Sequence, residues 1–138
     1  MLLPFPVLHA HSELAINVKL HLAGQTGLNL FTGYGPGYVA VNQVRYERSL
    51  IVLPERIIEA RMPERFDDLA AAHFEQLLAL DPEIILLGTG ATLRFPAPAL
   101  TRCLLRIGLE VMDTSAACRT YNILTAEGRK TAAAVLVN

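Results

Sequence analysis

The second half of the chain contains three short apolar runs separated by segments of helical character, and this order most constrains the fold. The runs are EIILLG (83–88), LEVM (109–112) and TAAAVLV (131–137). Continuous apolar runs of this length, bounded by turn residues, are typical of strands buried on both faces. A strand, helix, strand, helix, strand order favours parallel pairing with right-handed crossovers. We therefore predict an α/β fold whose helices cover a central sheet.

The helices between these strands are predicted from their end signals. Each begins at a residue that commonly caps or opens a helix, and each stops at a helix breaker. We expect helices from Asp67 or Asp68 to Leu80, from Pro98 to Gly108, and from Thr114 to Glu127, the last with Gly128 as its C-terminal cap.

The first half, from Val18 to about Met62, has the pattern of short antiparallel strands with Gly and Pro between them. These hairpins either extend the central sheet or pack on it as an additional β layer, and the sequence leaves both arrangements open. The expected strands are 18–22, 38–41 and 44–46 on either side of Asn42-Gln43, 49–53, and 57–61.

Length and composition indicate one compact unit. A chain of 138 residues with 52% hydrophobic residues can bury a single core. We expect one domain over residues 18–138, preceded by a poorly ordered extension over residues 1–17. The 12 basic and 13 acidic residues are scattered and give a net charge of −1, so a nucleic-acid partner is not expected.

The same composition predicts a cytoplasmic protein. No apolar run reaches the roughly 18 residues of a membrane span, and the N-terminus lacks the basic region of a signal peptide. The two cysteines, Cys103 and Cys118, lie in helical contexts that suit reduced thiols. Membrane contact is therefore expected only through a protein partner.

Two loops are the candidate ligand site. If strands 83–88 and 109–112 are parallel, their carboxyl ends open on the same edge of the sheet, where α/β folds usually bind ligands. Glycines there let the backbone approach a ligand, and the start of the next helix offers N–H groups to an anion. The candidate residues in the loops are Gly88, Thr89, Gly90, Asp113 and Thr114.

A second interpretation of these loops is that they only turn the chain. The dinucleotide fingerprint requires a third glycine where Leu93 stands, and a phosphate loop requires Gly-Lys-Ser/Thr where Ala91-Thr92 stands. Neither motif is present. Asp113 has two interpretations as well, as a general base or as the N-cap of the helix.

The helix after Asp113 carries three further candidates. Cys118 is either a nucleophile, which would require a lowered pKa and a nearby base, or a buried structural cysteine. Arg119 and Asn122 share one helix face and either recognise a carboxylate or a partner, or form a solvated surface.

Two other segments carry residue types that can bind a metal ion or contact a protein. His9 and His11 could share one strand face, but no third ligand accompanies them, so a non-ligand role is favoured. No metal and no cofactor are expected. The segment GYGPGY is typical of a turn, and its Tyr34 and Tyr38 could form a contact patch for a protein.

Long stretches of the chain resemble one known family. LNLFTGYGPGYVAVNQVRYERSLIVLP, LLALDPEIILLGTGATLRFPAPAL and IGLEVMDTSAACRTYNILTAEGRKTAAAVLV are similar to domain of unknown function 498, the MTH 938-like family. The resemblance covers about Val18 to Val137. The family's motif assigns a catalytic role to none of the residues it matches here, which are Gly88, Thr89, Gly90, Asp113, Thr114, Ala117, Arg119, Thr120, Tyr121, Asn122, Glu127 and Arg129.

The resemblance implies a three-layer fold with a mixed central sheet, helices covering it, and an added N-terminal antiparallel β-hairpin layer. The family includes an assembly factor of mitochondrial respiratory complex I. We therefore expect a non-enzymatic interaction or assembly protein whose partner is an unidentified protein, such as a respiratory complex subunit. The alternative is a small-molecule or anion-binding protein, or an enzyme, that uses the crevice between the GTG and MDT loops.

Overall fold

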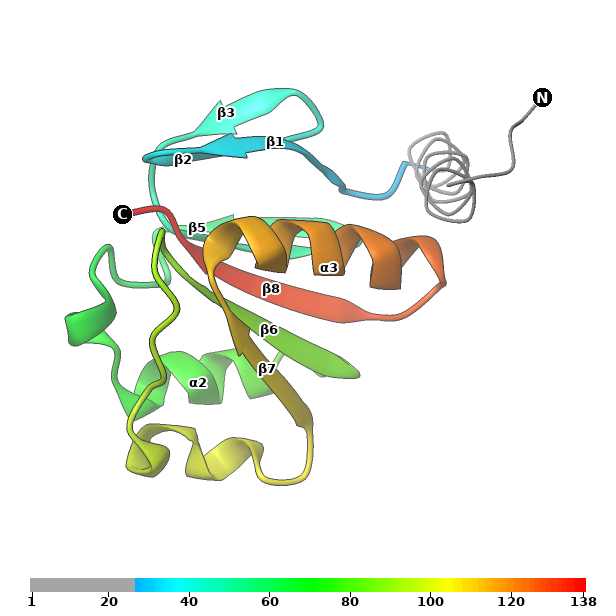
Figure 1. The fold of residues 1–138 in the computed structure, drawn as a ribbon. Helices are drawn as coiled ribbons and strands as arrows, with labels where there is room; N and C mark the ends of the chain where they lie inside the picture. Colours follow the sequence, from blue (N-terminus) through cyan, green and yellow to red (C-terminus); the bar gives the residue numbers. More distant parts are fainter. Residues whose placement is uncertain (1–26) are drawn as a thin grey trace, which may run out of the picture.

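The computed structural model describes residues 27–138, which form two sheets with helices on both sides of the larger one (Figure 1). Three predictions fall outside these residues: the extension at 1–17, the strand at 18–22, and the pair His9 and His11. The family resemblance, which starts at about Val18, begins outside the described residues and continues through them to Val137. The other predicted strands and helices lie within them.

The central sheet has five strands in the order β5-β4-β8-β6-β7. Strand β6 pairs in parallel with both β7 and β8, as the apolar runs predict, whereas β4 is antiparallel to both β5 and β8. The sheet is therefore mixed. Its strands are β4 (Leu50–Leu53), β5 (Arg56–Glu59), β6 (Ile84–Thr89), β7 (Gly108–Met112) and β8 (Thr131–Leu136).

A second, three-stranded antiparallel sheet precedes the central one. Asn42 and Gln43 connect two of its strands with φ values of 52° and 71°, the backbone of a tight hairpin turn. Both arrangements left open for the hairpins occur, because β4 and β5 extend the central sheet while the first three strands form a separate layer. These three are β1 (Phe31–Gly35), β2 (Tyr38–Val41) and β3 (Val44–Tyr46).

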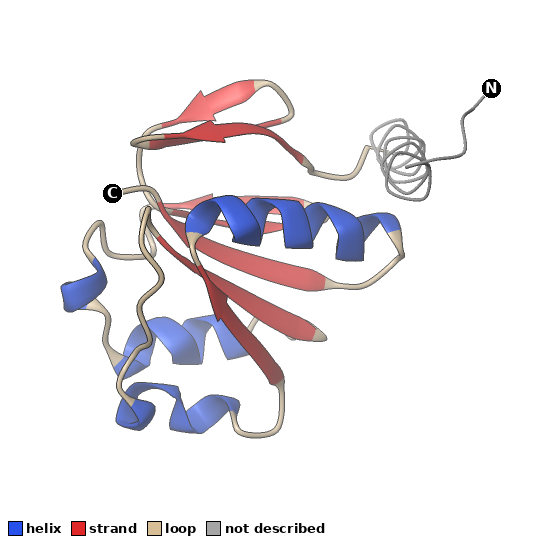
Figure 2. Cartoon of the chain, in the orientation of Figure 1, coloured by secondary structure: helices blue, strands red, loops and turns tan. Residues whose placement is uncertain are grey.

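The helices lie on opposite faces of the central sheet (Figure 2). Helix α3 (Thr114–Ala126) covers β6 and β8 on the face that also carries β1–β3. Helix α2 (Ala71–Leu78) and the 3₁₀ helix η2 (Pro98–Leu104) pack together on the other face. The molecule therefore has three layers, with the mixed sheet in the middle.

Alternate side chains of the central strands enter two separate cores. On the α3 side, Leu86 and Val135 join a cluster with Phe31 and Tyr121. On the α2 side, the neighbouring residues of the same strands pack with Phe74 and Leu77. Because successive residues of a strand point to opposite faces, a strand with a core on each side needs apolar residues throughout.

The start of the first predicted helix, which corresponds to α2, was predicted wrongly. Asp67 and Asp68 lie in a separate 3₁₀ turn, η1 (Phe66–Asp68), and α2 begins only after Ala70. Leu69 between them has extended backbone, which carries its side chain into the core. The Ala70 N–H donates a hydrogen bond to His73 Nδ1 at 2.9 Å, so a histidine provides the side-chain contact at this helix start.

Gly108 does not end the helix that was predicted to begin at Pro98. Pro98 opens η2 as expected, but the helix stops at Leu104, and Gly108 is the first residue of β7. There it pairs with Ile84, and a Cβ atom would lie 3.2 Å from Ile84 Cγ1. The glycine is needed for close strand contact and not for a helix cap.

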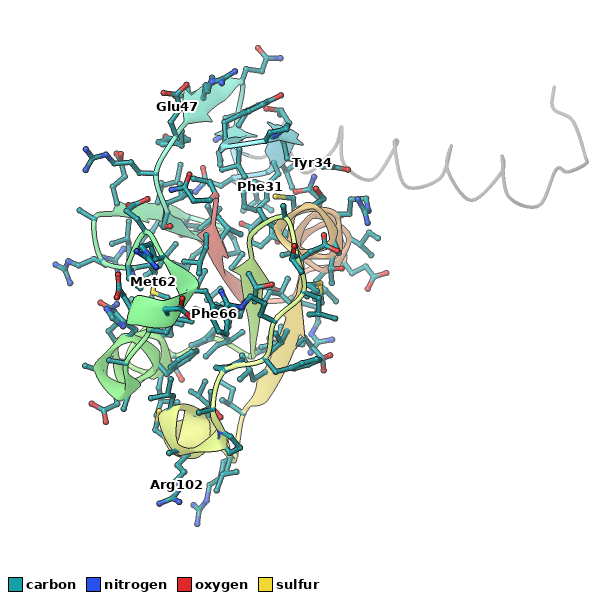
Figure 3. All side chains as sticks on the ribbon, turned by 60° about the vertical axis from the view of Figure 1, so that its left-hand side comes forward. Phe31, Tyr34, Glu47, Met62, Phe66 and Arg102 are labelled. Carbon is teal, nitrogen blue, oxygen red and sulfur yellow. The ribbon has the colours of Figure 1, made fainter. Side chains whose placement is uncertain are left out.

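Asn122 of α3 attaches the three-stranded sheet to the rest of the molecule. Its Oδ1 accepts a hydrogen bond from Phe31 N at 2.8 Å, and its Nδ2 donates to the Phe31 carbonyl at 2.7 Å. The Phe31 ring meets the Tyr121 ring edge-on, with centroids 5.3 Å apart. The Tyr121 hydroxyl donates to the Asn29 carbonyl at 3.0 Å. Figure 3 shows Phe31 beside α3.

We predict that Asn122→Ala lowers the free energy of unfolding by about 2–4 kcal/mol, because it leaves the Phe31 N–H and C=O without partners. Urea unfolding would measure the loss, and hydrogen exchange should become faster in 31–41. Ile123→Ala, on the exposed side of the same helix turn, is the control and should cost less than about 1 kcal/mol. Equal costs for the two variants would contradict the role of Asn122.

Candidate functional site

The parallel pairing of β6 and β7 brings the two predicted loops into direct contact. The Thr114 N–H donates to the Gly90 carbonyl at 2.9 Å, and the Gly90 N–H donates to Thr114 Oγ1 at 2.8 Å. The loops therefore meet at the carboxyl edge of the sheet, where the sequence places them.

The polar groups of these loops are bonded within the protein. Thr114 is only 7% exposed, and its hydroxyl donates to the Leu136 carbonyl of β8 at 2.5 Å. Thr114 thus joins β6, α3 and β8 through one oxygen atom. A ligand that used this hydroxyl would have to displace two internal hydrogen bonds.

The two glycines serve close packing at this edge. A Cβ atom on Gly88 would lie 3.0 Å from Thr114 Oγ1 and 3.2 Å from Ala117 Cβ. Gly90 has a φ of 98°, and a Cβ atom there would lie 2.5 Å from the Asn138 carbonyl oxygen. Gly88 therefore allows α3 to approach β6, and Gly90 allows the C-terminal backbone to fill the space beside the loop.

Asp113 is the N-cap of α3. Its side chain accepts a hydrogen bond from Ala116 N at 2.9 Å. The N–H groups of Thr114 and Ala116 are thus both bonded within the chain, and a carboxylate lies beside them. Such an arrangement satisfies the helix terminus without an external anion.

Thr89 holds the loop that follows β6. Its hydroxyl donates to the Thr92 carbonyl at 2.7 Å and accepts from Arg94 N at 3.2 Å. The Arg94 guanidinium lies over the Phe66 ring, 4.2 Å from its centroid, and bonds Asp67 at 2.7 Å. This loop is therefore fixed at its backbone and through its one charged side chain.

Arg119 and Asn122 do not belong to the loop edge. Asn122 lies about 12 Å along the helix from Thr114, given 1.5 Å per residue, and binds the Phe31 backbone. Arg119 is exposed, and its Nη1 donates to the Tyr34 hydroxyl at 3.1 Å. The seven candidate residues therefore divide into a loop group and a pair facing the three-stranded sheet. Ligand binding by either group remains a prediction.

Cys118 is packed in the α3-side core and is fully buried. Burial raises the pKa of its thiol from 9.0 to about 12, although the Arg119 charge acts in the opposite direction. A thiol with this pKa is protonated at neutral pH and is a poor nucleophile. Residues 27–138 also contain no group of three His, Cys, Asp or Glu side chains that could hold a metal ion.

Two surface features were not foreseen from the sequence. One is the exposure of the apolar segment ATLRFPAPA at residues 91–99, which its composition could have indicated. The other is a cavity of about 580 Å³ at the opposite end of the sheet, between the β4–β5 turn and the end of α3. Its walls come from segments far apart in the chain, so no local sequence pattern predicts it.

The protein is a three-layer α/β domain with a mixed central sheet. The loops at the carboxyl edge of that sheet are hydrogen-bonded to each other. The chain belongs to the family described as Protein of unknown function (DUF498/DUF598), whose sequence model matches residues 31–136.

Similar proteins agree with this membership. A solved Bordetella pertussis protein, described as a Mth938-like domain, is 35% identical, with a TM-score of 0.69 over 80% of this chain and 87% of that one. A 13 kDa major membrane protein of Francisella tularensis is 30% identical, over 77% of this chain and 89% of that one. In the part of this chain that is described, no helix is long and apolar enough to span a bilayer.

One relative carries a functional name. The NADH dehydrogenase [ubiquinone] 1 alpha subcomplex assembly factor 3 of Bos taurus is 33% identical over 104 residues. The match covers 72% of this chain but only 55% of the length of the bovine protein. The family thus includes assembly factors of this name.

Two buried threonines give a matched test of the loop edge. Thr114→Val removes a hydroxyl with two partners and should destabilise the protein by about 2 kcal/mol or more. Thr131→Val removes a buried hydroxyl that has no partner among residues 27–138, so stability should be unchanged or should rise by about 1 kcal/mol. Urea unfolding midpoints would measure both. A Thr131→Val variant as unstable as Thr114→Val would refute this account.

Cys118 should resist alkylation in the folded protein. At pH 8 we expect iodoacetamide to modify the half-buried Cys103 first, with Cys118 reacting only after unfolding, as followed by mass spectrometry. Because the folded pKa lies above the unfolded one, the unfolded thiol ionises first as pH rises. Stability should therefore fall between pH 9 and pH 12, and less steeply in Cys118→Ala. Faster labelling of Cys118 than of Cys103 would contradict its burial.

Proposed function

We propose that this protein is a non-enzymatic interaction or assembly factor that binds its partner through residues 91–99, which comprise the loop after β6 and the first two residues of η2 and are named the interaction loop. Seven of its nine residues are apolar, and eight of the nine are exposed. Leu93 is 48% exposed and Phe95 is 71% exposed. Exposed large apolar side chains gathered in one segment are a feature of protein-binding sites.

The fixed backbone of the interaction loop supports this proposal. Thr89 bonds the loop at Thr92 and Arg94, and the Arg94 side chain is held by Phe66 and Asp67. A loop that is already ordered loses less conformational entropy when a partner binds. Phe95 is then an aromatic anchor of the type that dominates the energy of protein interfaces.

The relatives named as assembly factors support the same class of function. By this proposal the protein is cytoplasmic, its partner is a subunit of respiratory complex I or of a comparable complex, and it meets the membrane only through that partner. The Gly90–Thr114 edge then has a structural role, because it anchors the base of the interaction loop.

The test compares the wild type with two variants in a strain that lacks the gene. Leu93→Ala/Phe95→Ala removes the apolar tips of the interaction loop. Leu105→Ala, at a side chain that is 85% exposed and lies after η2, is the matched control. Both variants should fold with unchanged melting temperatures, because the truncated side chains are exposed.

We expect the wild type and Leu105→Ala to restore complex I assembly on native gels and to recover the same partner by affinity purification. The double variant should do neither. Normal complex I in the deletion strain, together with no specific partner for the wild type, would refute the proposal. A double variant that works as well as the wild type would refute the role of the loop.

A further inference from the structure

We propose that the cavity of about 580 Å³ at the amino edge of the parallel strands binds a small amphipathic anion, with a carboxylate or phosphate head and an apolar body. This site is independent of the interaction loop, which begins at the opposite edge of the sheet. The cavity is lined by residues at the end of α3 that leads into β8. Figure 1 shows where this end of the helix lies. Its volume falls within the range of roughly 300–1,000 Å³ that is usual for small-molecule sites.

The cavity has apolar walls from three parts of the fold. They come from the segment before β1, the turn between β4 and β5, and the residues that follow α2. Such walls favour a hydrocarbon body, because its transfer from water is favourable in proportion to the apolar area buried. The wall residues are Leu28, Leu53, Pro54 and Leu80.

The charged residues around the cavity favour an anion. Arg129 donates to Glu83 at 2.7 Å, so that pair is locally neutral. Arg56 and Lys130 also line the cavity and are both exposed, and the lining contains one carboxylate, that of Glu55. A surplus of one positive charge therefore remains at the cavity of a protein whose overall net charge is −1.

The end of α3 does not oppose an anion as strongly as a bare helix terminus would. The carbonyl ends of a helix carry partial negative charge when they lack partners. Here Gly128, with a φ of 86°, turns the chain so that Gly128 N donates to the Thr125 carbonyl at 3.0 Å. Arg129 N donates to the Leu124 carbonyl at 2.9 Å. The Leu124 and Thr125 carbonyl groups at this helix end thus already have donors.

The chemistry of the site can be tested with four probes on the full chain by isothermal titration at low salt. Octanoate and octyl phosphate combine an anionic head with an apolar chain. Octanol supplies the chain alone, and inorganic phosphate supplies the head alone. We expect saturable binding of one or both amphipathic anions, weakening as salt is added, and at least about tenfold weaker binding of octanol and of inorganic phosphate.

Two charge-matched variants locate the binding. Arg56→Gln/Lys130→Gln should weaken binding of the amphipathic anions at least about fivefold. Arg102→Gln/Arg106→Gln removes the same charge from a separate groove beside η2 and should leave binding unchanged. Figure 3 shows Arg102 on the side of η2 that points away from the central sheet.

Three outcomes would overturn the proposal. One is no binding of either amphipathic anion at millimolar concentration. Another is equal affinity for octanol or for inorganic phosphate, which would remove the need for both parts of the ligand. The third is loss of binding in Arg102→Gln/Arg106→Gln with retention in Arg56→Gln/Lys130→Gln, which would move the site to the other groove.

Discussion

Burial of the central strands on both faces is the constraint on which the rest of this structure depends. Strands β4, β6 and β8 place alternate side chains in two cores, so each face of the sheet requires a cover. Helix α3 covers part of one face, and the three-stranded sheet completes it through Phe31, Val39 and Val41. Helix α2 and η2 cover the other face. The three layers follow from this requirement, since an uncovered face would expose a strip of Leu, Ile and Val side chains.

The sequence predicts those parts of the fold that depend on local signals. The apolar runs predict β6, β7 and β8 and their parallel pairing, and Asn42-Gln43 predicts a hairpin turn. The local signals gave wrong helix ends at three residues, Asp67, Asp68 and Gly108. Each is of a type that is common at helix ends, but tertiary packing places it in a different element. The β4–β5 hairpin joins the central sheet through β4–β8 pairing, in which Ile51 lies opposite Ala134. No local sequence pattern predicts a contact between residues so far apart in the chain.

The candidate site shows a similar division. Its location at one sheet edge follows from parallel pairing, and the contact between Gly90 and Thr114 agrees with it. The sequence does not predict which group occupies the space at that edge. A glycine permits close approach of a ligand and of the protein's own backbone equally well. Here the carbonyl of Asn138 lies beside Gly90. The cavity of about 580 Å³ lies at the opposite end of the strands from the usual position of ligand crevices in α/β folds.

The bond between Asn122 and Phe31 also has a consequence for folding during synthesis. The two residues are 91 positions apart, although β1, β2 and β3 connect only through short hairpins. The hairpins can form as soon as they leave the ribosome, but their surface for docking exists only after α3 has been made. Phe31, Val39 and Val41 therefore remain uncovered while most of the chain is translated. During this interval their apolar surface is open to aggregation and to binding by a chaperone.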